Sequence, residues 1–272
     1  MRLIPILVIA LLVSGCGNLP VPPIFRTSVP GFDTRTYPGD KVMELWLDES
    51  PYRWVGYYLP APCYTGNSWV GKRARLTEMG WGIAVLFVGE QDWAASAGSD
   101  PTPIAREGAR CTRTNVTAAN GRADAQGAAV ATASEGFGAG TIVFLDVERV
   151  DRVSTNLAAY VRAWIRGMLD DGRYTPGLYA HADNADTLYV IAQQEFSAWG
   201  RTDSPRLWVT RSADFDIDRA PSDAGIAGAA IWQGRLDAEL EWGGTRLLID
   251  ENVALRGLPG ITDFSFQQLL TR

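Results

Sequence analysis

Residues 141–148 of this 272-residue chain read Thr-Ile-Val-Phe-Leu-Asp-Val-Glu, an apolar run that ends in two carboxylates. An apolar run without alternation is typical of a strand buried on both faces of a parallel sheet. Side chains alternate along a strand, so Asp146 and Glu148 point to the same face. Barrels of alternating strands and helices place their chemistry at the carboxyl ends of their strands. Because burying a carboxylate is costly without compensation, this pair is a candidate site.

Strand and helix signals alternate along much of the chain. Strands are predicted at 29–33, 54–59, 82–89, 141–148, 175–180, 207–211, 229–233 and 247–253, and helices at 38–49, 70–79, 118–136, 154–171 and 184–199. The early strands are separated by helices, whereas the last strands have short connections. At this length, the alternation predicts an α/β fold, a (β/α)₈-like TIM barrel whose last helices are short or missing.

The first 16 residues indicate a targeting segment. Arg2 precedes an apolar stretch at 3–13, and Val13-Ser14-Gly15-Cys16 matches a bacterial lipobox, in which the cysteine becomes lipidated. The apolar stretch is too short for a transmembrane helix, which needs about 20 residues. We therefore expect a lipid anchor at Cys16 that attaches the protein to a membrane of the bacterial cell envelope, the outer membrane in a Gram-negative organism. An ordinary secretory signal is the alternative.

The remaining sequence predicts one domain. A Pro-rich tether at 17–29 cannot be helical, and residues 30–272 contain no interior stretch that resembles a linker. The net charge of −6 argues against a nucleic-acid partner, and we expect a monomer. The chain has 10 Trp and 9 Tyr, a supply for stacking on sugars, although any single aromatic is more commonly part of a core.

Lipidation of Cys16 would leave Cys63 and Cys111 as an even pair. The envelope is an oxidising compartment, so we expect a disulfide between them. Two unpaired buried thiols are the alternative.

Four carboxylates occur at predicted strand ends. Asp33 ends the first strand, Asp146 and Glu148 end the fourth, and Asp250 ends the eighth. The first and eighth strands are neighbours in a closed barrel, so the four groups are expected at one mouth. A single carboxylate at a strand end is more commonly a cap or accepts hydrogen bonds from a loop. Four such carboxylates together predict a functional site. We call this set, Asp33, Asp146, Glu148 and Asp250, the acidic cup.

The ordered motifs that carry a resemblance are Gly31-Phe32-Asp33, Asp146-Val147-Glu148, Gly177-Leu178-Tyr179, Ile231-Trp232-Gln233 and Ile249-Asp250-Glu251-Asn252. Over about residues 30–255 the chain resembles the glycoside-hydrolase-like barrel family, once catalogued as a domain of unknown function. That family is related to the Chalaropsis-type lysozymes, family 25 of the glycoside hydrolases. Their barrels have five strand–helix units followed by three strands, which agrees with the missing late helices here.

The resemblance implies a site for glycan, with peptidoglycan as the first expectation. Glu148 would be the general acid that protonates the glycosidic oxygen, its pKa raised by burial and by the charge of Asp146. Asp146 would stay ionised and either stabilise the oxocarbenium-like transition state or orient a substrate acetamido group. Asp33 and Asp250 would bind sugar hydroxyls or position water. Arg35 would lower the pKa of Asp33 if the two paired.

The resemblance also implies substrate-binding roles around these acids. Tyr179 and Trp232 would be walls of the site, and Gln233 would hydrogen-bond beside them. His181, the only histidine, would contact a sugar or cap the helix that follows it. A single histidine argues against a zinc site and against a Ser-His-Asp triad, so we expect no metal and no cofactor.

Two other functions remain open at this point. The protein would be a non-catalytic lipoprotein that binds glycan in the same cup, or a scaffold in an envelope complex. A glycan-binding protein would bind glycan without cleaving it. A scaffold would keep its role in the cell when the acids of the cup are mutated.

Overall fold

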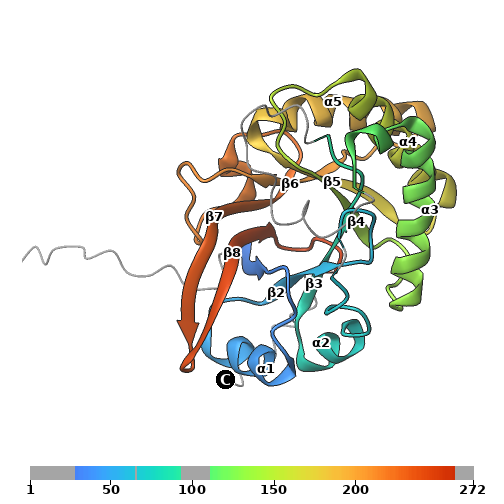
Figure 1. Cartoon of the computed structure of the whole chain (residues 1–272). Coiled ribbons are helices and arrows are strands. Elements are labelled where there is room, and N and C mark those ends of the chain that lie inside the picture. The colour runs from blue at the N-terminus through green and yellow to red at the C-terminus, as the bar shows by residue number, and fades with distance from the viewer. Residues whose placement is uncertain (1–27, 65, 93–110, 261–272) are drawn as a thin grey trace, which may run out of the picture.

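Figure 1 shows the computed structural model, which describes residues 28–64, 66–92 and 111–260. The strands are β1 (Ser28–Asp33), β2 (Trp54–Tyr58), β3 (Gly82–Val88), β4 (Ile142–Val147), β5 (Thr175–His181), β6 (Arg206–Thr210), β7 (Ala229–Trp242) and β8 (Thr245–Leu255). The helices are α1 (Asp40–Glu49), α2 (Arg73–Met79), α3 (Ala118–Ser134), α4 (Thr155–Asp171) and α5 (Ala182–Trp199), with 3₁₀ turns η4 (Arg113–Asn115) and η5 (Pro221–Ala224). The lipobox cysteine, Cys16, lies outside the described residues.

The eight strands form a closed barrel in sequential order. Neighbouring strands from β1 to β7 are parallel, whereas β8 runs antiparallel to both β7 and β1. The helices α3, α4 and α5 cover one side of the barrel and α1 and α2 another, while β7 and β8 extend beyond it as a long hairpin (Figure 1). The predicted barrel with a helix-poor final part is confirmed.

The sequence explains the helical layer. Ser154 caps α4 through its side chain, which accepts a hydrogen bond from the backbone N–H of Leu157. Below the cap, apolar residues at helical spacing bury one face of α4 against the barrel. Gly172 ends the helix in a left-handed conformation, the usual role of glycine at this position. Across the described residues, helices long and apolar enough to traverse a bilayer do not occur.

Aromatic residues fill the interior of the barrel. Trp208 is fully buried and meets Trp54 and Phe144 edge to face, with ring centroids 5.5 and 5.7 Å apart. Such pairs stabilise a core beyond the area that they bury. A Cβ on Gly31 would lie 2.1 Å from the Trp54 indole, so glycine is required for this packing. The filled interior closes the barrel below its mouth and leaves the site above it.

The last two strands differ most from the sequence prediction. They are longer than the predicted 229–233 and 247–253, and Asp250 lies within β8 rather than at its end. The arms of the hairpin have a polar, charged sequence without the apolar run of a central strand, so their full length was not predicted. At the other end, β1 begins at Ser28, two residues before the predicted start of the domain at 30.

Candidate active site

A pocket of about 330 Å³ opens at the mouth of the barrel above Trp208. This volume is within the usual range for small-molecule sites. Its lining contains all four acids of the cup, together with Thr34, Arg35, Tyr58, Tyr64, Leu86, Tyr179, Gln233, Asp237, Leu248 and Ile249. The predicted convergence of the four carboxylates therefore occurs in the folded chain.

Asp33 is held by three hydrogen bonds. The Tyr58 hydroxyl donates to Oδ1 at 2.7 Å, and the side-chain amides of Gln233 and Asn252 each donate to Oδ2 at 2.8 Å. Asn252 is itself fixed, because its Oδ1 accepts from Trp208 Nε1 at 2.8 Å. Asp33 is 2% exposed, so its carboxyl is a rigid acceptor rather than a mobile one.

Asp146 and Glu148 differ in exposure. Asp146 is buried and its Oδ1 has no hydrogen-bond partner in the described part of the chain, whereas Glu148 is partly exposed in the pocket. The intervening backbone is clamped by Gln91, whose Nε2 donates to the Asp146 carbonyl at 2.8 Å and whose Oε1 accepts from the Glu148 N–H at 3.1 Å. Because buried polar atoms are normally paired, the free Asp146 oxygen is a position for a ligand atom.

Burial raises the pKa of every acid in the cup. For Asp146 the charges of Glu148 and Asp33 add to burial and hold its pKa well above the usual range. Burial also raises the pKa of Glu148, with no contribution from Asp146. The direction for Asp146 runs against the expectation that it stays ionised, because burial and the neighbouring charges favour its protonated form. The pKa of Asp33 is raised as well, since burial outweighs its three donors, and not lowered by Arg35.

Asp250 lies across the pocket from the Asp146 strand. Its Oδ1 accepts from the backbone N–H of Asp237 at 2.7 Å, and its Oδ2 accepts from Gln233 Nε2 at 3.3 Å. Burial and the neighbouring charge of Asp33 raise the pKa of Asp250 to about 8. At neutral pH this carboxyl is therefore mostly protonated.

Two of the four predicted substrate-binding residues line the pocket. Tyr179 donates from its hydroxyl to Gln233 Oε1 at 2.7 Å, and both residues face the cup. Trp232 does not: it is fully buried on the other face of β7, against Phe215, and its Nε1 donates to the Arg211 carbonyl. Strand alternation explains the difference, because Trp232 precedes the inward-facing Gln233.

His181 adopts the second of its two predicted roles. It is the N-cap of α5, and its Nδ1 accepts a hydrogen bond from the Asp183 N–H at 3.1 Å. It is absent from the pocket lining. Glu251, next to Asp250 in the sequence, also points away from the cup, because its carboxylate accepts from the Tyr52 hydroxyl and pairs with Arg235 at 2.7 Å.

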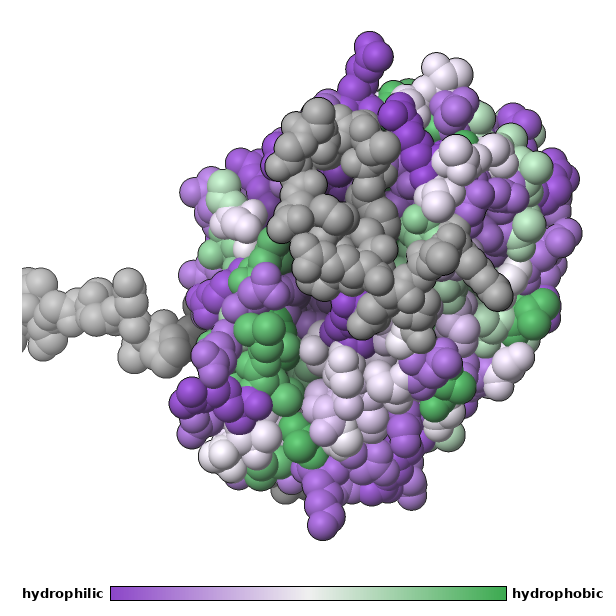
Figure 2. Space-filling view, in the orientation of Figure 1, coloured by the Kyte–Doolittle hydropathy of each residue, from purple (hydrophilic) through white to green (hydrophobic). Residues whose placement is uncertain are grey.

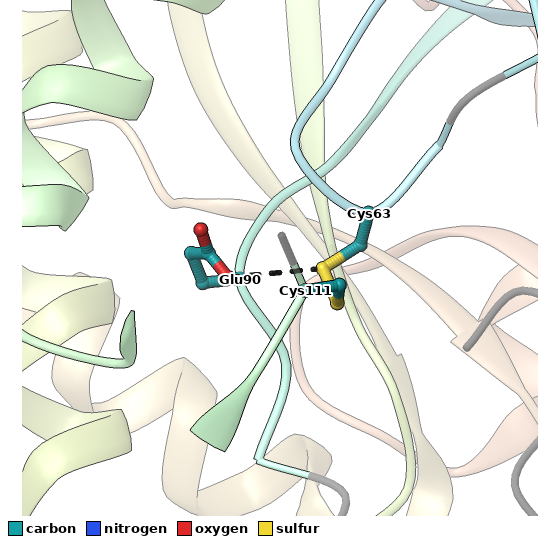
Figure 3. A group of neighbouring side chains, drawn as sticks. All are labelled: Cys63, Glu90 and Cys111. Atoms are coloured by element: carbon teal, nitrogen blue, oxygen red, sulfur yellow. Dashed lines mark hydrogen bonds between the residues drawn. A yellow bond between two sulfur atoms is a disulfide. The ribbon is translucent and has the colours of Figure 1, made fainter. Parts of the chain in front are cut away.

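The Cys63–Cys111 disulfide is present and joins the segment after β2 to the segment before α3 (Figure 3). Glu90 lies against it, with Oε2 at 4.0 Å from the Cys63 sulfur, and burial raises the pKa of Glu90 to about 7. Within the described ranges, these three residues form the one trio of potential metal ligands whose atoms all lie within 4.8 Å of one another. The disulfide occupies both sulfurs, so the trio does not offer two thiolates to a metal.

Several residues that line the pocket or hold its acids in place were not predicted from the sequence. Tyr58, Gln91 and Asp237 carry no motif, and only their positions at strand ends or in the last hairpin signalled a place near the mouth. Asn252 was part of a recognised motif but had no assigned role. Its role emerges only from the pairing of β7 with β8, which sets Asn252 opposite Gln233.

The outer surface at the mouth combines polar and apolar residues. Leu236 and Leu248 on the hairpin are large apolar residues that are 47% and 57% exposed, and Leu248 lines the pocket. On the face shown in Figure 2, hydrophobic residues gather over β7 and β8, within a surface that is otherwise mostly hydrophilic. The cup therefore has an apolar rim on the side of the hairpin.

Comparison with known proteins gives a consistent result. Residues 44–254 match the family described as Rv2525c-like, glycoside hydrolase-like domain. An uncharacterized B. stearothermophilus protein has a similar structure, with a TM-score of 0.56 at 18% identity over 86% of this chain and 99% of that one. No curated protein sequence matches the chain.

Two further solved structures also share the fold. The Clostridium perfringens spore cortex lytic enzyme SleM has a TM-score of 0.53 at 11% identity, over 84% of this chain and 67% of that one. The Streptococcus pneumoniae modular autolysin LytC has a TM-score of 0.52 at 11% identity, over 83% of this chain and 46% of that one. LytC has also been solved in complex with a synthetic peptidoglycan ligand. At these identities the likeness shows a common fold.

Proposed function

This chain belongs to the Rv2525c-like, glycoside hydrolase-like domain family, and we propose that it is a glycosidase of the cell envelope that cleaves cell-wall glycan in its acidic cup. The observation that carries the proposal is the pairing of Asp146 with Glu148 in the pocket. One acid is buried with an unpartnered oxygen, and the other is partly exposed beside it. A pair of carboxyl groups at the scissile bond is the usual machinery of glycoside hydrolysis.

Glu148 is the proposed general acid. Burial raises the pKa of its carboxyl, which favours the protonated form that a general acid needs, and its partial exposure lets that proton reach a glycosidic oxygen in the pocket. As the proton is transferred, the bond from the anomeric carbon to that oxygen breaks and the alcohol leaves. Positive charge then develops on the sugar ring, where an ionised Asp146 would stabilise it. Water adds to the anomeric carbon and returns a proton to Glu148, which completes the hydrolysis.

The protonation of Asp146 must therefore change during the reaction. In the free protein, burial favours protonated Asp146, and any charge on Glu148 or Asp33 adds to this effect. While Glu148 still holds its proton and a sugar amide donates to the free Asp146 oxygen, the carboxylate form of Asp146 becomes more favourable. Hydrogen bonding by an acetamido N–H would supply such a donor, which makes an N-acetylated glycan the preferred substrate class.

The comparisons support peptidoglycan as the glycan. SleM is a spore cortex lytic enzyme and LytC is an autolysin solved with a peptidoglycan ligand. Both share the fold of this chain, although their low identity carries no residue-level assignment. The proposed lipid anchor at Cys16 would hold the cup close to this polymer in the bacterial envelope, and the monomer would act through a single site.

The test compares purified wild-type protein with Glu148→Gln on isolated peptidoglycan. We expect wild-type protein to release reducing ends and the variant to lose this activity by about 100-fold or more, while glycan binding measured by sedimentation persists. Exchange of the distant, exposed Glu78 for Gln is the matched control and should leave the rate unchanged. No release by wild-type protein from any glycan would sink the proposal.

Binding without catalysis is the second candidate, and one observation favours it. Burial raises the pKa of all four cup acids, and three donors occupy Asp33. Protonated carboxyls, which these shifts favour, are suited to hydrogen bonding with sugar hydroxyls. In this case Glu148→Gln and wild-type protein would bind glycan equally and neither would release reducing ends.

A further inference from the structure

The backbone of β7 is irregular where it passes the cup. Two register shifts interrupt its pairing with β8, the first between Gln233 and Arg235 and the second between Arg235 and Ala238. At the second shift, Leu236 and Asp237 together oppose the single residue Asp250, which defines a β-bulge. Bulges commonly occur beside active sites, where they redirect a group on the strand.

Asp237 has a backbone conformation that side chains disfavour. Its φ of +49° lies in the left-handed region, and the described residues contain one further non-glycine residue of this kind, Asp214 at +60°. Only short polar residues such as Asp and Asn tolerate this region with some ease. The conformation directs the Asp237 N–H to Oδ1 of Asp250 at 2.7 Å, in place of a regular ladder partner.

The bulge is supported from its other side. Arg235 pairs with the buried Glu251 at 2.7 Å, and the Tyr52 hydroxyl donates to the same carboxylate. A Cβ on Gly234 would lie 1.7 Å from the Phe215 ring, so the first shift also requires a particular residue. These contacts fix the path of β7 independently of Asp237. They therefore determine that position 237 is the one that adopts the left-handed conformation.

We propose that Asp237 is a positioning residue for Asp250: its left-handed backbone holds the Asp250 carboxyl toward the pocket, and its own carboxylate lies at the rim beside it. This inference rests on the proposed function for its meaning in catalysis, but the positioning itself can be tested without turnover. Asp237 acts on Asp250 in two opposite ways. Its N–H lowers the pKa of Asp250, and its negative charge raises it.

Other ionisable groups also face the Asp250 carboxyl, and all of them stay unchanged in the variants below. They are Asp33 on β1, Tyr58 on β2, Glu148 after β4 and Tyr179 on β5. Because these contributions are constant, any difference among substitutions at position 237 reports the two effects of that residue alone.

Different substitutions at position 237 separate the effect of its N–H on the pKa of Asp250 from the effect of its charge. Asp237→Asn and Asp237→Gly keep a residue that adopts positive φ and remove the charge, so the pKa of Asp250 should fall by the same amount in both. Asp237→Val removes the charge and also disfavours positive φ, because β-branched residues avoid this region. Its N–H is then lost from Asp250, so the pKa should be higher in the Val variant than in the Asn and Gly variants.

The measurement is the titration of the Asp250 side-chain carbon by NMR, together with the amide shift of residue 237. In wild-type protein the two titrate together, and in the Val variant the amide should no longer follow Asp250. Asp237→Ala, a milder change, serves if the Val variant does not fold. Asp214→Val, which imposes the same backbone demand away from the pocket, should leave the Asp250 titration unchanged.

Equal pKa values of Asp250 in the Asn, Gly, Ala and Val variants would overturn the positioning role. A wild-type amide of residue 237 that does not follow the Asp250 titration would overturn it as well. If the titrations behave as expected and peptidoglycan is not cleaved, the positioning stands and the hydrolase proposal fails. If cleavage occurs, the Asn variant should shift the rate profile to lower pH with little change in KM.

Discussion

Asp33 and Asp250 lie directly opposite each other on antiparallel strands, β1 and β8. Directly opposed residues share a face of the sheet, so both carboxyls enter the same pocket, and Gln233 Nε2 donates to both of them. Like charges at this separation disfavour double ionisation, which contributes to the pKa of about 8 at Asp250. Ionisation of either acid therefore changes the pKa of the other.

This pairing makes stability depend on pH. An acid whose pKa is raised in the folded state keeps its proton there while the unfolded chain loses it. Stability therefore decreases as pH rises from about 4 to about 8. Asp250→Asn, which cannot ionise, should match wild-type protein near pH 4 and exceed its unfolding free energy at pH 8. The expected excess is about 1–3 kcal/mol, which is less than the shift would give at about 1.4 kcal/mol per pKa unit because Asp250 is partly exposed and screened by solvent.

Urea denaturation at several pH values would check this. The exposed Asp151, changed to Asn, is the control and should follow the wild-type curve. A constant difference between Asp250→Asn and wild-type protein across the range would contradict the expected linkage.

The buried amide of Asn252 should matter for stability and for the site. Asn252→Ala leaves Trp208 Nε1 without an acceptor and removes one donor from Asp33. Unpaired buried polar groups cost about 1–3 kcal/mol each, so we expect a loss of roughly 3 kcal/mol in thermal or chemical unfolding. Exchange of the exposed Asn156 for Ala should change stability by less than about 0.5 kcal/mol. Equal effects of the two changes would refute the assigned network.

A methyl group at position 56 should disturb the cup without altering any of its acids. A Cβ on Gly56 would lie 2.5 Å from the Cβ of Asp33 and 3.2 Å from Trp208. Overpacking of this kind costs about 1–3 kcal/mol, and displacement of Asp33 should weaken glycan binding as well. Isothermal titration with soluble muropeptides would measure the loss.

Gly127→Ala is the matched control for that change. A Cβ at this position of α3 meets nothing within 4 Å. Because alanine is favoured over glycine inside a helix, the control should be stabilised by about 0.5–1 kcal/mol and bind glycan normally. If Gly56→Ala behaved in the same way, the close contact with Asp33 would have no consequence.

The disulfide should contribute to stability in proportion to the loop that it closes. Cys63 and Cys111 are 48 residues apart, and the chain-entropy model gives about 4 kcal/mol for a loop of this size. The double change Cys63→Ser and Cys111→Ser should lower the unfolding free energy by about this amount. Reduction of wild-type protein should produce the same loss, whereas the double variant should not respond to a reductant.

Much of the fold was predictable from local sequence. The apolar run before Asp146 and the capped amphipathic helix after Ser154 are both found as expected, because burial and capping act on neighbouring residues. The paired cysteines also meet as predicted. The length of the β7–β8 hairpin was not predictable, since its polar arms are stabilised by strand pairing and not by an apolar pattern.

The candidate site also combines features that the local sequence predicts with features that depend on the pairing of distant segments. By itself, the sequence determined the barrel, the spacing of Asp146 and Glu148 on one face, and the presence of acids on the first, fourth and eighth strands. Only the tertiary structure decided that β8 is antiparallel, so that Asp250 meets Asp33 from within the strand, and that Trp232 and His181 lie outside the pocket. It also decided that a bulge aims the Asp237 N–H at Asp250. The physical reason is that strand direction, register and bulges are fixed by pairing between distant segments, whereas alternation and caps are properties of the local chain.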